Sequence, residues 1–158
     1  MRFSNWFCRR KICNTRFFDL PFLLEFDLKY EYDTLEEGIT IPAVLRLTGK
    51  TAYCDAKVDP GAQVCVFQRE VGEAIGIDVE SGNRIKLGSL GGPVIAFGHW
   101  VTLNTFDWEF DSLVYFARDY NLPRNLLGRE GWLQKTRLAV VDYEAELYLS
   151  PYGNDAVT

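Results

Sequence analysis

Hydrophobic and polar positions alternate along most of the chain, and this two-residue period predicts β-strands. Two alternating runs, residues 39–47 and 51–58, are joined by the short polar sequence Thr48-Gly49-Lys50, which is typical of a β-hairpin. Residues 137–142 and 144–150 have the same pattern and predict a final hairpin. The chain is therefore expected to be mainly β.

A further hairpin is predicted in the middle of the chain, with residues 84–87 and 94–97 as its strands and Gly88-Ser89-Leu90-Gly91-Gly92 as its tip. The glycines of this tip permit positive φ angles and easy movement. Residues 100–110 then alternate aromatic with other side chains, and we expect them to form one long strand with an aromatic face. Residues 113–117 predict the next strand.

The remaining segments are shorter. Residues 17–32 read as extended structure interrupted by Pro21, and residues 62–67 as an apolar strand. Residues 68–78 predict a short helix that stops at Gly76, and residues 129–135 predict a second one. Residues 117–125 are expected to form a loop fixed by Pro123. No internal repeat is evident.

The composition disfavours some classes of binding partner. The 158 residues fit one globular domain, and a formal charge of -5 disfavours nucleic acid. No segment approaches the ~20 apolar residues of a membrane helix, so we expect no membrane partner. Arg9, Arg10 and Lys11 interrupt the apolar run that a secretory signal needs, so we expect a cytoplasmic protein. Residues 1–16 hold five basic and no acidic side chains. They read as a flexible basic tail, with an electrostatic tether to an anionic surface as the alternative.

The cysteines and the one histidine point away from metal or thiol chemistry. The spacing of Cys8, Cys13, Cys54 and Cys65 matches no zinc or redox motif, and we expect four reduced, buried thiols. His99 alone supplies neither a metal site nor the base of most nucleophilic schemes, so it is expected to be a packed or surface imidazole. No metal and no cofactor is expected.

Asp59 is the candidate for chemistry. It ends the apolar strand of the first hairpin and is followed by Pro60, Gly61 and Ala62. An acid in that position sits on a tight, half-sheltered loop. Asp-Pro-Gly is also ordinary β-turn sequence, so this motif alone does not distinguish a catalytic loop from a turn.

The order of the surrounding motifs is informative. The sequence AKVDPGAQVCVF, the Ile75-Gly76-Ile77 that follows, the glycine-rich residues 87–92, the Asn-Leu-Leu-Gly-Arg of residues 125–129 and the terminal hairpin occur in the order and at the distances of one family. Over residues 37–150 the chain resembles the retropepsin-like aspartic proteases. The resemblance implies the closed acid-protease barrel of one retropepsin lobe, with two short helices and a flap hairpin.

The same resemblance divides the chain and assigns roles. It implies a basic tail at residues 1–16, an N-terminal extension at 17–36, a retropepsin-like domain at 37–152 and a C-terminal tail at 153–158. Asp59 would be the catalytic carboxylate, working as a coupled pair with a second aspartate to activate water against a peptide bond. The residues implied to contact the substrate are Gly61, Ala62, Leu90, Gly91 and Gly92. Those implied to support the loop are Pro60, Gly128 and Arg129, with surface charge as the alternative for Arg129.

Pro60 departs from the family pattern, which has Thr or Ser after the aspartate. Pro supplies neither the hydroxyl that braces the two loops of the family nor a backbone N–H. The resemblance therefore leaves two functions open, a homodimeric aspartic endopeptidase and a catalytically impaired module that binds proteins or peptides in the same groove. A third hypothesis is a β-barrel binding domain that is unrelated to peptidases.

The chain has one Asp-x-Gly-Ala loop and no repeat, whereas aspartic chemistry needs two carboxylates. The enzymatic interpretation therefore requires a symmetric homodimer, with a polypeptide as substrate or ligand.

Overall fold

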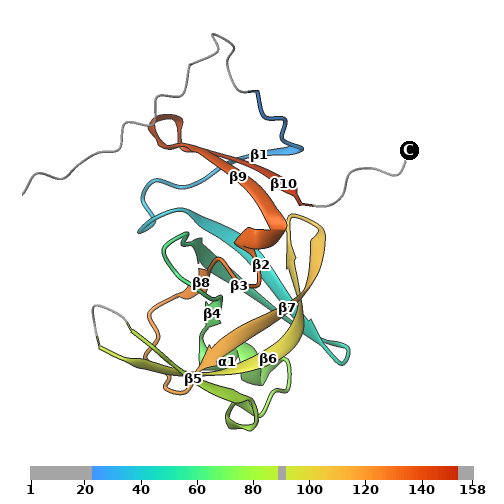
Figure 1. The fold of residues 1–158 in the computed structure, drawn as a ribbon, viewed down its shortest axis with the longest axis vertical. Coiled ribbons are helices and arrows are strands. Elements are labelled where there is room, and N and C mark those ends of the chain that lie inside the picture. The colour runs from blue at the N-terminus through green and yellow to red at the C-terminus, as the bar shows by residue number, and fades with distance from the viewer. Residues whose placement is uncertain (1–22, 89–91, 153–158) are drawn as a thin grey trace, which may run out of the picture.

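The computed structural model describes residues 23–88 and 92–152. The expected basic tail, the C-terminal tail and the hairpin tip with Leu90 and Gly91 lie outside these residues. Within them β-strands dominate, as the alternation predicts (Figure 1). The strands are β1 (Leu28–Glu31), β2 (Thr40–Leu47), β3 (Lys50–Val58), β4 (Val66–Phe67), β5 (Asn83–Leu87), β6 (Val94–Thr105), β7 (Trp108–Ala117), β8 (Asn125–Leu127), β9 (Thr136–Val141) and β10 (Glu146–Pro151).

Six of these strands close into a barrel. They pair in the order β2-β3-β8-β4-β7-β6, and β6 returns to β2 through Leu45 opposite Leu103. Most neighbours are antiparallel, but β3 runs parallel to β8 and β4 parallel to β7. The strand β5 pairs only with β6 and extends the sheet beyond the barrel. The closed barrel implied by the family resemblance is confirmed.

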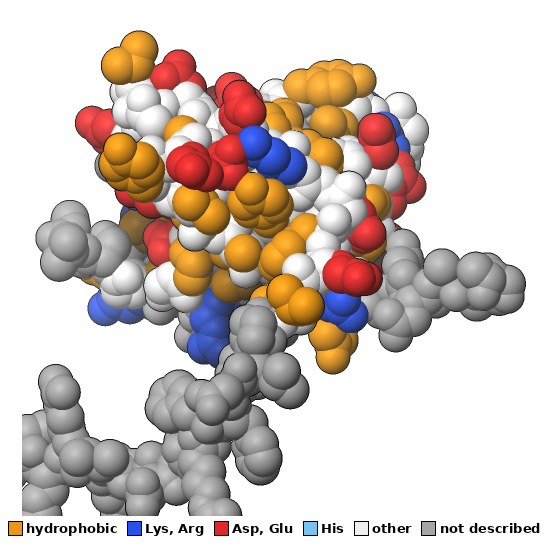
Figure 2. Space-filling view, turned by 90° about the horizontal axis from the view of Figure 1, so that it is seen from above, with side chains coloured by type: hydrophobic (Ala, Val, Ile, Leu, Met, Phe, Trp, Pro, Cys, Tyr) orange, Lys and Arg blue, Asp and Glu red, His pale blue; other side chains and the backbone are white. Residues whose placement is uncertain are grey.

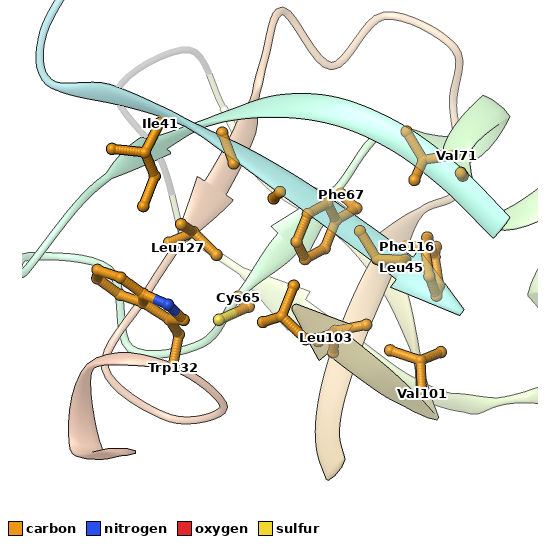
Figure 3. Packing of buried hydrophobic residues seen from close by; sticks show 14 of the residues in the cluster. Ile41, Leu45, Cys65, Phe67, Val71, Val101, Leu103, Phe116, Leu127 and Trp132 are labelled. Atoms are coloured by element: carbon orange, nitrogen blue, oxygen red, sulfur yellow. The ribbon is translucent and has the colours of Figure 1, made fainter. Parts of the chain in front are cut away.

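Alternate side chains of the barrel strands meet in one hydrophobic core. Trp132, which lies between β8 and β9, is fully buried. Its indole N–H donates to Thr105 Oγ1 over 3.0 Å. Because the indole N–H is satisfied, this large ring is buried without a polar penalty. Figure 3 shows the surrounding side chains, which include Ile41, Leu45, Cys65, Phe67, Leu103, Phe116 and Leu127.

The first hairpin forms as predicted. Its turn residues Thr48 and Gly49 have φ angles of 47° and 82°, the left-handed pair that suits the twist of two-residue hairpins. The single long strand expected at residues 100–110 is wrong. The chain instead turns at Phe106 and Asp107, with φ angles of 52° and 68°, and Thr105 pairs with Trp108. The turn also exchanges the faces, since Val101 and Leu103 are buried before it and Ser112 and Val114 after it, so one aromatic face does not run through residues 100–110.

Two further expectations are corrected. The strand expected at residues 62–67 is reduced to β4, because Val64 forms only an isolated bridge with Glu130 and the Cys65 amide donates to the Glu130 carbonyl. The first helix forms as α1 (Arg69–Ala74), and Gly76 with a φ of 86° follows it. The second expected helix is only the 3-10 turn η2 (Leu133–Lys135), since Gly131 has a φ of 97° that a helix does not accept. Two other 3-10 turns are η1 (Val79–Ser81) and η3 (Asp142–Glu144).

A second, three-stranded sheet with the order β1-β10-β9 covers one end of the barrel (Figure 1). It contains the predicted final hairpin, and the expected N-terminal extension supplies β1. Tyr30 of β1 packs on Phe106 at the β6–β7 turn, with ring centroids 5.0 Å apart. Seen from this end, hydrophobic and acidic side chains are interspersed (Figure 2). In the described part of the chain no helix is long and apolar enough to cross a membrane.

Candidate active site

Asp59 is positioned by the parallel pair β3 and β8. Val58 pairs with Leu127, and the next amide, that of Asp59, donates to the Leu127 carbonyl over 3.0 Å. The ladder therefore continues up to the aspartate, which fixes its backbone at the end of the barrel strand. The side chain is half-buried.

The residues after Asp59 form a tight turn that orients the carboxylate. The Ala62 amide donates to the Asp59 carbonyl over 3.1 Å, which places Pro60 in the second position of the turn, where its φ angle is favoured. The Gly61 and Ala62 amides also donate to Asp59 Oδ1, over 2.9 and 3.2 Å. Among the described residues no group donates to Oδ2. The turn thus holds one carboxylate oxygen and leaves the other available.

Gly128 and Arg129 hold this loop through their backbone. A Cβ atom on Gly128 would lie 2.2 Å from the Val64 carbonyl oxygen, so only glycine allows the two segments to come so close. The Arg129 amide donates to the Ala62 carbonyl over 2.9 Å. The Arg129 side chain is exposed and forms no hydrogen bond or ion pair within the part of the chain that the structure describes.

A groove of about 850 Å³ runs beside the loop. Gly61 and Ala62 form part of its wall, and Gly92, in the segment that connects β5 to β6, lies on the wall that this hairpin provides. Apolar side chains make up much of the rest: Val66, Leu87, Pro93, Val94, Ile95, Ala117, Leu122, Pro123 and Leu126. The lining suits an extended, largely apolar chain.

The sequence interpretation missed the contribution of residues 117–126 to the groove, because it treated most of them as a loop. Their position is set by Asn125, a buried side chain whose Nδ2 donates to the Asp55 carbonyl over 2.9 Å and whose Oδ1 accepts from the Gln68 amide over 2.8 Å. Gln68 Nε2 in turn donates to the Leu122 carbonyl over 3.0 Å. Apolar Leu122 and Leu126 in an otherwise polar loop were the available signal.

The described thiols and the histidine do not line the groove. Burial, together with the nearby Asp55 carboxylate, raises the pKa of the Cys54 thiol to about 12, and burial raises that of Cys65 to about 12. Both thiols are free and uncharged at neutral pH. His99 packs against Phe116, and its Nε2 lies 2.9 Å from the Val79 carbonyl oxygen. Within residues 23–88 and 92–152 no group of three His, Cys, Asp or Glu could hold a metal ion.

Comparison with known proteins identifies the fold. A retropepsin-like aspartic protease from Rickettsia conorii matches 78% of this chain and 97% of its own, with a TM-score of 0.59 and 16% identity. The EIAV protease complexed with the inhibitor HBY-793 matches 61% of this chain and 86% of its own, with a TM-score of 0.47 and 21% identity. No protein-family model and no curated protein sequence matches the chain. The protein has a retropepsin-like fold.

Proposed function

We propose that the protein is an aspartic endopeptidase that acts as a homodimer. The observation that carries this proposal is the Asp59 carboxylate, held through Oδ1 by two backbone amides and open at Oδ2, on a retropepsin-like barrel beside an apolar groove. Asp59 is the catalytic residue in this proposal. Gly61, Ala62 and Gly92 contact the substrate, and Pro60, Gly128 and Arg129 shape and support the loop.

Two Asp59 side chains, one from each subunit, would provide the acid and the base. Like charges in contact cannot both ionise, so the pair shares one proton and titrates as a unit. The ionised member takes a proton from a water molecule as that water attacks the peptide carbonyl, and the protonated member donates to the carbonyl oxygen. The peptide would lie extended along the groove, with the β5–β6 hairpin as its flap.

The terminal sheet offers a surface for the second subunit. Its outer strands β1 and β9 leave one edge each unpaired among the described residues, and unpaired edges readily accept another strand. The side chains of Val140, Val141 and Tyr143 are exposed on the same part of the molecule. An isologous interface there would bury these side chains.

Replacing Asp59 tests the proposal directly. The purified protein is incubated with a denatured protein substrate at acidic and near-neutral pH, beside the variants Asp59→Asn and Asp55→Asn. Asp55 is an exposed carboxylate on the same strand and does not line the groove, so it is the matched control. We expect Asp59→Asn to lose at least about a hundredfold in cleavage rate and Asp55→Asn to keep its rate. Equal cleavage by wild type and Asp59→Asn, or none by either, contradicts the proposal.

A binding module without catalysis is the second candidate, and Pro60 favours it. The proline suits the turn but brings no hydroxyl to brace the loop against a second copy. Pro60→Thr restores the hydroxyl and the amide at this position. Cleavage gained by Pro60→Thr, with none by wild type, identifies the present protein as the binding module. Comparable cleavage by both proteins excludes it.

A further inference from the structure

The wall of the groove nearest Asp59 carries two cationic side chains. Lys57 stands opposite Leu126 in the β3–β8 register, and both residues line the groove. Arg124 precedes Leu126 by two residues and also lines it. Lys57 precedes Asp59 by two residues, a separation of about 7 Å along an extended chain. Lys57 therefore lies where the substrate residue next to the cleaved bond would pass, and Arg124, level with Asp55 in the same register, lies farther along the groove.

The half-buried Lys57 side chain forms no ion pair within the described parts of the chain, although it also lines a neighbouring hollow with Glu36, Glu37 and Asp55. Its stem lies over Gly38, where an added Cβ would come within 2.5 Å of Lys57 Cε, so the stem is confined. The only carboxylate among the groove-lining residues described is Asp119, and Arg118 already pairs with it at 3.1 Å. The groove is thus net positive in a chain whose formal charge is -5.

The Arg124 charge is compensated by a partner that a ligand can replace. The guanidinium forms an ion pair with the Glu37 carboxylate and donates to the Glu37 carbonyl over 2.7 Å. The Glu37 side chain is 84% exposed, and exposed ion pairs contribute little to stability. A carboxylate arriving in the groove can therefore compete with Glu37 for Arg124 at little cost.

We propose that Lys57 and Arg124 select peptides that carry an Asp or Glu side chain beside the cleaved bond. This inference rests on the proposed function for the place of the bond, while selection by the groove is a matter of binding. A peptide carboxylate would pair with Lys57 Nζ and share Arg124 with Glu37. The apolar lining around Val66 and Ile95 would hold the neighbouring hydrophobic residues. Charge-assisted hydrogen bonds of this kind are stronger than neutral ones.

The test uses three fluorescein-labelled octapeptides, Ala-Ala-Val-Xaa-Leu-Val-Ala-Ala, with Glu, Gln or Leu at the variable position. Binding to the full-length Asp59→Asn protein is measured by fluorescence anisotropy, and cleavage by wild type is measured in parallel. We expect the Glu peptide to bind about tenfold more tightly than the Gln peptide, with a preference that shrinks as salt is raised. Where cleavage occurs, the Glu peptide should show the higher kcat/KM.

Matched variants locate the effect. Lys57→Met keeps a stem over Gly38 but removes the charge, and we expect it to lose most of the preference for Glu over Gln. Lys86→Met removes the same charge from an exposed position on β5 outside the groove lining, and should leave the preference unchanged. Arg124→Gln should independently weaken the preference for the Glu peptide over the Gln peptide.

The outcomes separate this inference from the proposed function. Glu-selective binding without any cleavage supports the selective groove and contradicts the endopeptidase. Cleavage or binding with no preference for Glu overturns the inference and leaves the endopeptidase standing. Failure of all three peptides to bind, or a preference that survives Lys57→Met and Arg124→Gln, also overturns it.

Discussion

The barrel and the terminal sheet differ in how their edges are closed. The barrel is closed, and its interior is filled by fully buried side chains such as Trp132, Phe67 and Phe116. The terminal sheet buries Leu147 and Leu149 in the same core, but each of its outer strands leaves one edge unpaired among the described residues, and polar contacts add to its packing. Lys29 pairs with Glu146, and the Tyr32 hydroxyl donates to Asp142 Oδ1 over 2.6 Å.

The barrel and the terminal sheet therefore suit two different tasks, positioning of a carboxylate and association with another chain. The loop that carries Asp59 is attached to the rigid barrel, which suits a carboxylate that must be positioned closely. The terminal sheet presents exposed apolar side chains and unpaired edges, which suit association with another chain. In the proposed homodimer, the barrel would therefore hold one half of an aspartic site, and the terminal sheet would be the surface that brings in the other half.

The largest effect is expected from emptying the barrel core. Trp132→Ala removes a fully buried ring and leaves the Thr105 hydroxyl without its donor, so the free energy of unfolding should fall by about 3 to 5 kcal/mol. Trp100→Ala is the matched control, because that ring is 66% exposed, and its cost should stay below about 0.5 kcal/mol. Urea unfolding followed by circular dichroism measures both. Equal costs would contradict the account of the barrel.

Replacing Gly128 with alanine is expected to reduce stability less than Trp132→Ala does, but to reduce activity strongly. In Gly128→Ala the new methyl group meets the Val64 carbonyl at 2.2 Å, so the loop must shift, at a cost of about 1 to 3 kcal/mol. Peptide cleavage should fall far more than the folded fraction does, because the shift moves the loop that holds Asp59. Gly88→Ala adds a methyl group into open space and serves as the control for stability. Unchanged cleavage by Gly128→Ala would show that the loop is not positioned through this glycine.

The smallest effect concerns pH and is expected at Glu146 in the terminal sheet. The hydrogen bond from Lys29, with a second one from Tyr148, lowers the pKa of Glu146 below its ordinary value. A lowered pKa in the folded state means that this contribution is complete above the ordinary pKa of glutamate and is lost as pH falls through the lowered value. Acidification below about pH 4.5 should therefore loosen β1 before the barrel.

Amide hydrogen exchange measures this difference. Exchange of the β1 amides, corrected for the intrinsic effect of pH, should accelerate at low pH relative to β6 and β7. Glu146→Gln should remove most of that dependence, because the amide does not titrate. A barrel that loosens together with β1 would contradict the separation of the two regions.

The sequence predicted those parts of the fold that local chemistry determines. Alternation located most strands, and Gly49 marked the first hairpin because glycine accepts positive φ, which the β-branched Thr48 adopts beside it. Phe106 could not be recognised as a turn residue, since its left-handed backbone is unusual for an aromatic side chain and is accompanied by packing on Tyr30 from a distant strand. Gly131 ended the second expected helix, and its positive φ was likewise not recognisable from the sequence.

The candidate site was predictable only where its residues are adjacent in sequence. Asp59, Gly61 and Ala62 form one turn, so a short motif was enough to find them. The groove wall combines β3 with β8 and the β5–β6 hairpin, and its register depends on pairings such as Lys57 with Leu126 that alternation does not specify. For that reason Lys57 and Arg124 were not recognised as groove residues before the structure placed them together.

Subunit mixing tests the central claim, that each chain supplies one of two carboxylates, most directly. Wild-type protein is mixed with increasing amounts of Asp59→Asn protein at constant total concentration, allowed to exchange subunits, and assayed for peptide cleavage. If both carboxylates are needed, activity follows the square of the wild-type fraction and falls to about one quarter in an equal mixture. Activity that falls only in proportion to the wild-type fraction, to about one half, would mean that a single chain is sufficient and would contradict the account.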